Sequence, residues 1–117
     1  MTKRYPSSIL VSCEISWDEN HELIEHTFRA EIRGAMATYN NLYIFGTAGE
    51  GYAVTLTQFS EVAEVFWEET DRPDVHQMVG VIAMSTVQVV ERIATAYQIG
   101  FRVFQITLPP WSALSEN

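Results

Sequence analysis

Four short apolar runs alternate with three amphipathic stretches along this chain, and that alternation constrains the fold more than any other feature. The runs are rich in branched and aromatic side chains and cover residues 9–15, 42–45, 77–83 and 101–108. Continuous apolar character over so short a length indicates strands buried on both faces, as in a parallel sheet. Parallel strands need crossover connections, which helices usually supply with right-handed geometry. The sequence therefore predicts an α/β fold in the order β-α-β-α-β-α-β.

The stretches between the runs carry helix signals. Residues 21–39 place Ile24, Phe28, Ile32 and Met36 at every fourth position, which is typical of an apolar helix stripe. The next helix begins at a predicted capping box, Thr55 with Gln58, and runs to about residue 70. We expect its acidic residues to form a solvated face instead of a metal site; they are Glu61, Glu64, Glu68 and Glu69.

The last predicted helix begins at a second capping box, Ser85 with Gln88, and ends at Gly100, which is a good C-cap residue. Its predicted buried stripe consists of Val89, Val90, Ile93, Ala94 and Tyr97.

A glycine-rich turn follows the second apolar run: Gly46-Thr47-Ala48-Gly49-Glu50-Gly51. Glycine permits positive φ and a close approach of the backbone to a ligand. At the end of a buried parallel strand, such a turn exposes backbone N–H groups that bind a carboxylate or a phosphate. A plain strand-to-helix turn explains the spacing equally well, so spacing alone leaves both interpretations open.

The same stretch resembles the Gly-Thr-Thr-Gly-Glu motif of the dihydrodipicolinate synthase and N-acetylneuraminate lyase family. Members of that family are pyruvate-dependent class I aldolases and lyases built as TIM (β/α)8 barrels. Residues 80–96 are similar to the family's third strand and helix, and residues 100–111 to its fourth strand with the proline-aromatic loop. A complete barrel needs about 250 residues. The resemblance therefore implies that residues 1–117 form a single domain, the N-terminal half-barrel, whereas the alternation by itself also fits a flavodoxin-like sheet.

The resemblance assigns roles to residues at the carboxyl ends of the strands. Thr47 takes the place of the catalytic hydroxyl in a proton relay. The family's second hydroxyl binds the substrate carboxylate, and Ala48 stands there, which leaves the backbone N–H groups around Ala48 and Gly49 for that task. The remaining expectations are that Gly46 and Glu50 structure the loop, and that Ser16, Trp111 and Ser112 line the pocket. Which of Trp111 and Ser112 replaces the family's relay tyrosine stays open.

The family's central reagent, a lysine on the sixth strand, has no counterpart here. Schiff-base formation requires a nucleophilic amine, and Lys3 is the one lysine in the sequence. We therefore expect the chain to be inactive alone, as the N-terminal part of a Schiff-base lyase. Two alternatives remain: a non-catalytic half-barrel that binds small carboxylates or assembles with another half-barrel, and an unrelated phosphate binder.

Composition restricts the partners. The net charge of −8 argues against a nucleic-acid or anionic-membrane surface, because both partners require a basic patch. Cys13 is the only cysteine, which excludes an internal disulfide, and we expect it to be a small core residue. No signal peptide or membrane span is expected. The family resemblance implies a homo-oligomer that acts on a small 2-keto acid, with no cofactor and no metal, and we expect it to be cytoplasmic.

Overall fold

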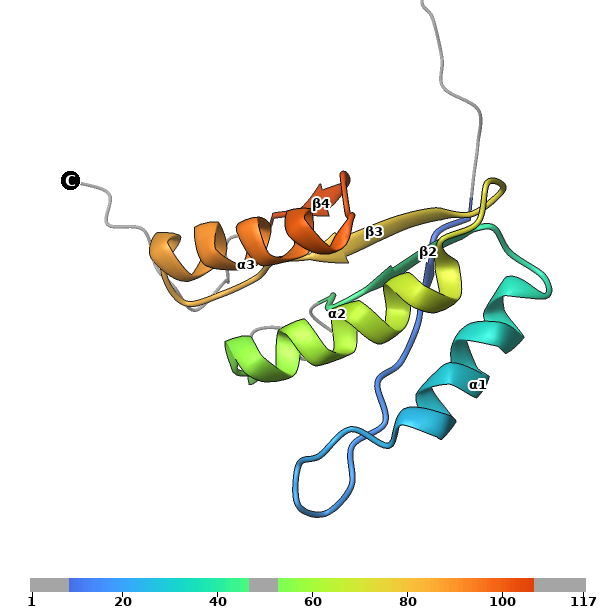
Figure 1. The fold of residues 1–117 in the computed structure, drawn as a ribbon, viewed down its shortest axis with the longest axis horizontal. Helices are drawn as coiled ribbons and strands as arrows, with labels where there is room; N and C mark the ends of the chain where they lie inside the picture. The colour runs from blue at the N-terminus through green and yellow to red at the C-terminus, as the bar shows by residue number, and fades with distance from the viewer. Residues whose placement is uncertain (1–8, 47–52, 107–117) are drawn as a thin grey trace, which may run out of the picture.

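The computed structural model describes residues 9–46 and 53–106 (Figure 1). Strands and helices alternate strictly, as predicted. In chain order they are β1 (Val11–Ser12), α1 (Glu25–Met36), β2 (Asn41–Ile44), α2 (Leu56–Thr70), β3 (His76–Gly80), α3 (Thr86–Ile99) and β4 (Phe104–Gln105).

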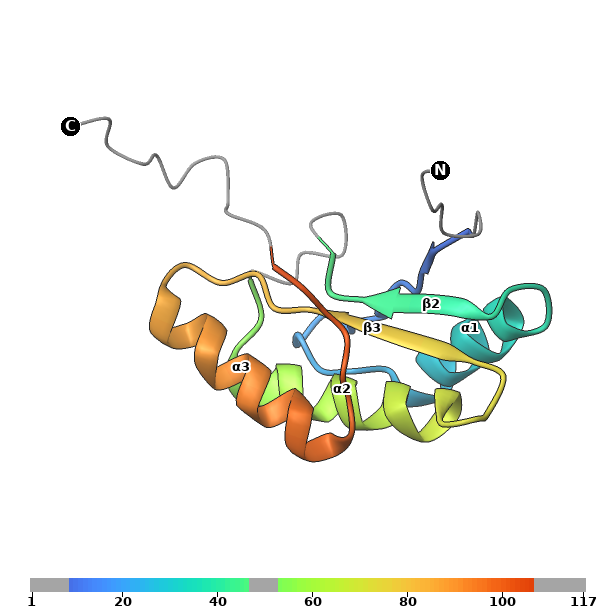
Figure 2. The same ribbon diagram turned by 90° about the horizontal axis from the view of Figure 1, so that it is seen from above.

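The four strands form one sheet in the order β1-β2-β3-β4, and all three pairings are parallel. Leu42 lies opposite Val11 on one side and Gln77 on the other, and Val79 lies opposite Phe104. All three helices cover the same face of the sheet (Figure 2). A flavodoxin-like sheet has a reversed strand order and helices on both faces. The fold is therefore an arc of parallel β/α units, as in a TIM (β/α)8 barrel.

The outer strands are shorter than the apolar runs that predicted them. β1 contains two residues where the run covered 9–15, and β4 contains two where the run covered 101–108, of which residues 107 and 108 lie outside the described part. Both are edge strands that pair on one side, and edge strands are commonly short.

The first helix begins at Glu25, four residues later than the sequence predicts. The Asp18 carboxylate accepts hydrogen bonds from the backbone N–H groups of Asn20 and Glu22, at 2.8 and 2.9 Å. Such side-chain acceptors offer the backbone an alternative to helix geometry. Residues between β1 and α1 therefore form a loop, which Trp17 and Leu23 close through an antiparallel bridge.

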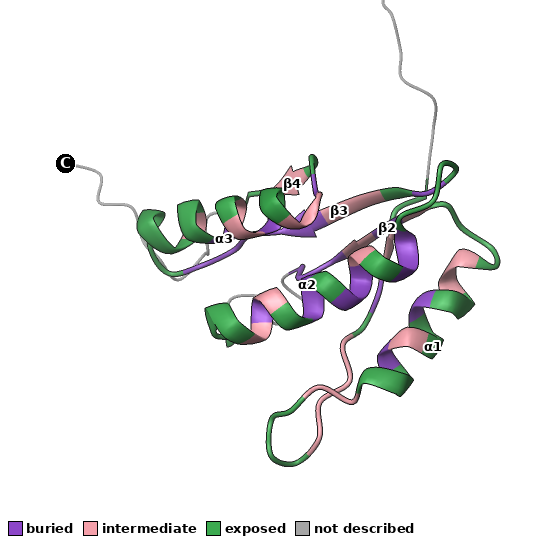
Figure 3. Cartoon of the chain, viewed as in Figure 1, coloured by how far each residue is buried: buried purple, intermediate pink, exposed green. Residues whose placement is uncertain are grey.

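The core lies between the sheet and the helices (Figure 3). Its largest fully buried apolar side chains are Phe28, Ile32, Leu42, Ile44, Phe45, Phe59, Val62, Phe66, Val79, Val81 and Phe101. The stripe predicted for α3 is wrong in part. Arg92 and Ala96 are its buried residues, whereas Val90, Ala94 and Tyr97 are exposed. These three face away from the sheet, and the guanidinium of Arg102 lies over the Tyr97 ring.

The capping boxes differ from each other. The Thr55 hydroxyl accepts from the Gln58 N–H, and the Gln58 side chain accepts from the Thr55 N–H, so the first box is complete. In the second, the Ser85 hydroxyl accepts from the Gln88 N–H, but the Gln88 side chain accepts from the Met84 N–H. Gly100 ends α3 with φ 145°, a conformation that favours glycine.

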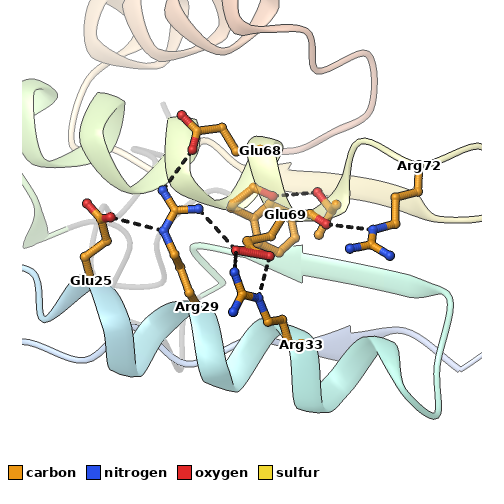
Figure 4. A network of polar contacts seen from close by, with 8 residues as sticks. Glu25, Arg29, Arg33, Glu68, Glu69 and Arg72 are labelled. Atoms are coloured by element: carbon orange, nitrogen blue, oxygen red, sulfur yellow. Dashed lines mark hydrogen bonds and ion pairs between the residues drawn. The ribbon is translucent and has the colours of Figure 1, made fainter.

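An ion-pair network joins α1 to α2 (Figure 4). Its centre is Glu69, whose side chain is only 6% exposed, so the prediction of a solvated face is wrong for this residue. Arg33 donates to both carboxylate oxygens of Glu69, at 3.0 and 2.7 Å, and Arg29 donates to one of them at 3.2 Å. Arg29 also contacts Glu25 and Glu68. Two guanidinium groups thus compensate one nearly buried carboxylate.

Candidate functional site

The carboxyl ends of the parallel strands meet at one edge of the sheet, which is where (β/α)8 barrels gather their reacting groups. The described residues at this edge include Ser16 after β1 and Gly46 after β2. The predicted catalytic and binding residues Thr47, Ala48, Gly49, Glu50, Trp111 and Ser112 lie outside the described residues, so their roles stay predictions. The described part of the site therefore consists of the residues that precede the glycine turn and pack around its first residue.

The residue directly before the glycine turn, Phe45, has an unusual backbone conformation. Phe45 adopts φ 63°, a left-handed conformation that is uncommon for a bulky residue, and its side chain is buried. A Cβ on neighbouring Gly80 would collide with the Phe45 carbonyl group. A Cβ on Gly46 would lie 2.8 Å from the Tyr43 ring. Two glycines thus provide the space for the turn, and the positive φ falls on a phenylalanine.

Aromatic and cationic side chains hold Phe45 in place. Its ring stacks on Phe59 of α2, with 4.9 Å between ring centroids. The guanidinium of Arg92 lies 5.4 Å from the centroid of Phe59, a favourable cation–π distance. This column links the end of β2 with the first turn of α2 and the second turn of α3.

Arg92 is the buried cation of this edge, and it connects two segments. One of its Nη atoms donates to the carbonyl of Ile82, which follows β3, at 2.9 Å. The other donates to the carbonyl of Val54, which precedes α2. Burial lowers the pKa of the Arg92 guanidinium from its ordinary value, but an arginine in a protein remains charged at neutral pH. The positive charge of Arg92 therefore lies next to the segment that follows β3 and the segment that precedes α2.

Sequence reasoning missed both Phe45 and Arg92 as parts of the site. The two residues differ in how far the sequence indicates their role. Val89, Arg92 and Ala96 follow helical spacing on the sheet-facing side of α3, so an arginine on the buried side was detectable. Nothing in an apolar run marks which residue takes a positive φ.

A hollow lies beside this edge, between the β1–α1 loop and the start of α2. Trp17, His21, Val54 and Gln58 line it, and the Gln58 side chain donates to the His21 carbonyl at 3.1 Å. Ser16 is half-buried, and its carbonyl accepts the Ile24 N–H at 2.9 Å. Ser16 and Trp17 are thus neighbours at the edge, and Trp17 packs against the core as well as bordering the hollow.

Cys13 does not provide a nucleophile. Its side chain is 2% exposed. Burial, with a smaller contribution from the negative charge of Glu31, raises the pKa of the Cys13 thiol to about 12. The thiol is therefore protonated at neutral pH, as expected for a small core residue. Within residues 9–46 and 53–106, no group of three histidine, cysteine, aspartate or glutamate side chains has the arrangement of a metal site.

Comparison with known proteins identifies the fold through structure alone. No protein-family model and no curated protein matches the sequence. The N-acetylneuraminate lyase from Fusobacterium nucleatum matches with a TM-score of 0.81 at 18% identity, over 92% of this chain and 38% of that one. The 4-hydroxy-tetrahydrodipicolinate synthase from Methylacidiphilum fumariolicum SolV matches with a TM-score of 0.80 at 15% identity, over 94% and 37%.

A putative dihydrodipicolinate synthetase from Pseudomonas aeruginosa matches with a TM-score of 0.82 at 16% identity, over 95% of this chain and 39% of that one. The resemblance predicted from the glycine turn is therefore confirmed at the level of the fold. The chain spans less than two fifths of the length of these enzymes. No helix in the described part of the chain is long and apolar enough to cross a membrane.

Proposed function

We propose that this chain is the N-terminal part of a Schiff-base lyase or aldolase of the dihydrodipicolinate synthase and N-acetylneuraminate lyase family. Its substrate is pyruvate or a related 2-keto acid. The observation that carries the proposal is the position of the glycine turn. The turn begins directly after β2, at the carboxyl end of a parallel sheet wound in barrel order, and the motif of the family occupies the same place.

In this proposal, Thr47 relays a proton and the N–H groups around Ala48 and Gly49 bind the substrate carboxylate. Gly46 and Glu50 hold the loop, and Ser16, Trp111 and Ser112 line the pocket. The packing of Phe45 against Phe59 supports the proposal, because a carboxylate-binding turn needs a fixed stem. The reactive lysine comes from a part of the barrel outside these 117 residues. The complete enzyme is a cytoplasmic homo-oligomer that needs no cofactor.

The first experiment measures carboxylate binding. The ¹⁵N-labelled chain is titrated with pyruvate, and chemical-shift changes are followed by NMR. We expect saturable shifts at residues 46–51 and at the pocket-lining residues Ser16, Trp111 and Ser112, and none with methyl pyruvate, which lacks the carboxylate. Ala48→Thr restores the family's second hydroxyl and tightens binding about tenfold, the effect of one hydrogen bond to a charged group. Thr47→Val leaves binding unchanged, because its proposed role is proton transfer. Equal shifts with methyl pyruvate would contradict the proposal.

The second experiment tests whether this chain carries an amine that forms a Schiff base with pyruvate. The chain is incubated with pyruvate and borohydride, and its intact mass is measured. We expect no adduct on this chain, because Lys3 precedes the first strand, and barrel strands begin at the face opposite the active site. A stoichiometric adduct would show that the chain carries its own Schiff-base amine.

A further inference from the structure

The face of the sheet opposite the helices carries a row of half-buried side chains. On β2, Leu42 and Ile44 belong to the core between the sheet and the helices. Because successive strand residues point to opposite faces, Tyr43 between them points to the face that lies away from the helices (Figure 2). Its partners in register are Ser12 on β1 and Met78 on β3, which are half-buried as well. In a barrel of this winding, that face is the interior.

The Tyr43 ring lies beside the first glycine of the turn. A Cβ added to Gly46 would lie 2.8 Å from the Cε2 atom of Tyr43 and 3.3 Å from its hydroxyl oxygen. The phenol therefore leans along the strand toward the carboxyl end, as strand side chains do. Although Tyr43 stands three positions before Gly46 in the sequence, its hydroxyl group lies where the glycine turn begins.

A second polar side chain lies on the same inner face. Phe104 of β4 packs against the core, so the next residue, Gln105, points to the inner side. The Oε1 atom of Gln105 is buried and has no hydrogen-bond partner in the described part of the chain. Barrel interiors are normally filled by branched apolar side chains. A phenol and an unpaired amide oxygen near the carboxyl ends of the strands instead indicate that this part of the interior receives a polar occupant.

The Tyr43 hydroxyl lies close to the proposed carboxylate site in the chain. Ala48 is two peptide units from Gly46, so their Cα atoms are at most about 7.6 Å apart. In a 2-keto acid, the keto carbon is bonded directly to the carboxylate carbon. When the N–H groups around Ala48 and Gly49 bind the carboxylate, the keto oxygen therefore comes within range of a donor at Gly46. A phenol can supply that donor, because its O–H group donates one hydrogen bond.

We infer that the Tyr43 hydroxyl donates a hydrogen bond to the keto oxygen of the bound acid, and that this contact selects 2-keto acids over simple carboxylates. A site built to hydrogen-bond one oxygen rejects the analogue that lacks it, because the protein group is then left unpaired. The inference rests on the proposed function, since it takes the glycine turn as the carboxylate site. It adds a residue that the sequence does not mark, because Tyr43 lies inside an apolar run.

The experiment compares pyruvate with propionate, which has the carboxylate but no keto oxygen. The ¹⁵N-labelled 117-residue chain and its Tyr43→Phe variant are titrated with each acid, and the dissociation constants are measured by NMR. We expect Tyr43→Phe to weaken pyruvate binding about fivefold, the effect of one neutral hydrogen bond, and to leave propionate binding unchanged. The substitution keeps the ring beside Gly46, so a ring that acts only as a spacer would not distinguish the two acids.

Two variants serve as matched controls. Ser12→Ala removes a hydroxyl group from the register partner of Tyr43 on the same face, where the side chain is too short to approach the turn. Tyr39→Phe removes a phenol hydroxyl before the opposite end of β2, from a side chain that is 39% exposed. Both variants should bind pyruvate and propionate as the parent chain does.

A second measurement needs no substitution. The ¹³Cζ resonance of Tyr43 in the parent chain should shift with pyruvate and change far less with propionate. Equal weakening of both acids by Tyr43→Phe, or a Tyr43 resonance that does not respond to pyruvate, would overturn the inference while the carboxylate site stands. If neither acid shifts the resonances of residues 46–51, the proposed carboxylate site is wrong, and the inference is wrong with it.

Discussion

The Glu69 carboxylate is nearly buried and contacts two arginines. Its removal should lower the free energy of unfolding by a predictable amount. Glu69→Gln keeps the volume of the side chain but removes the charge that faces Arg29 and Arg33. Because the shape is conserved, no cavity forms, and the loss in the free energy of unfolding reports on electrostatics and hydrogen bonding alone.

The magnitude follows from the contacts. Three hydrogen bonds from guanidinium groups reach the Glu69 oxygens, at 2.7, 3.0 and 3.2 Å. A hydrogen bond to a charged group contributes about 1.5–3 kcal/mol where it is shielded. The Arg33 side chain is 65% exposed, so water screens its share, and Arg29 keeps Glu25 and Glu68 as partners. We expect Glu69→Gln to cost about 2 kcal/mol at pH 7, which is below the roughly 3–5 kcal/mol for breaking a fully buried pair because the Arg33 side chain is exposed.

Urea denaturation followed by circular dichroism measures this loss. For a chain of this size, about 2 kcal/mol corresponds to a midpoint lower by about 1 M urea. The matched control is Glu68→Gln, which removes one 2.8 Å contact with Arg29 from a side chain that is 63% exposed. We expect that control to cost about 0.5 kcal/mol or less. Equal losses for the two variants would refute the assignment of Glu69 as the centre of the network.

The effect depends on pH with a definite sign. Hydrogen bonds from Arg33, and then from Arg29, lower the pKa of Glu69 below its ordinary value of 4.5, although burial opposes them. A carboxyl group with a lowered pKa in the folded state stabilises the fold above its unfolded pKa, and this contribution is lost as pH falls through the folded pKa. The difference between the parent and Glu69→Gln should therefore be constant from pH 7 to about 5 and shrink below about pH 4.5. A difference that persists unchanged at pH 2 would contradict this mechanism.

Three further outcomes are expected. Thr55→Ala removes the acceptor of the Gln58 N–H and should cost about 1 kcal/mol in thermal unfolding, whereas exposed Thr57→Ala should cost less. Gly80→Ala forces a methyl group against the Phe45 carbonyl and should cost about 3 kcal/mol or prevent folding, as measured by urea titration. Cys13, with a thiol pKa raised to about 12, should not react with a disulfide reagent at pH 8 until urea unfolds the chain; rapid reaction of the folded chain would contradict its burial.

The pattern of apolar runs and capping residues predicted the order of the elements because both signals are local. The complete box at Thr55 is a clear case, since the two hydrogen bonds lie within one helical turn. The box at Ser85 shows the limit of local signals. Gln88 has an equally local alternative in the Met84 N–H, and the choice depends on how the chain leaves β3.

The parts that sequence reasoning missed depend on contacts between distant residues. Glu69 becomes buried because Arg29 and Arg33, which lie 40 and 36 positions earlier in the chain, reach it from α1. The exposure of Val90 and Tyr97 depends on what packs beside α3, which no pattern within the helix reveals. The left-handed backbone of Phe45 depends on the space that Gly80 leaves on the next strand.

The consecutive strand order has a consequence for how the chain acquires its structure. Each strand pairs with the next one along the sequence, so each new pairing closes a loop of one helix only. The entropy cost of such a closure grows slowly with loop length, and at similar stability chains with local contacts fold faster than chains dominated by distant ones. A β/α unit can therefore dock on the unit before it without waiting for distant segments of the chain.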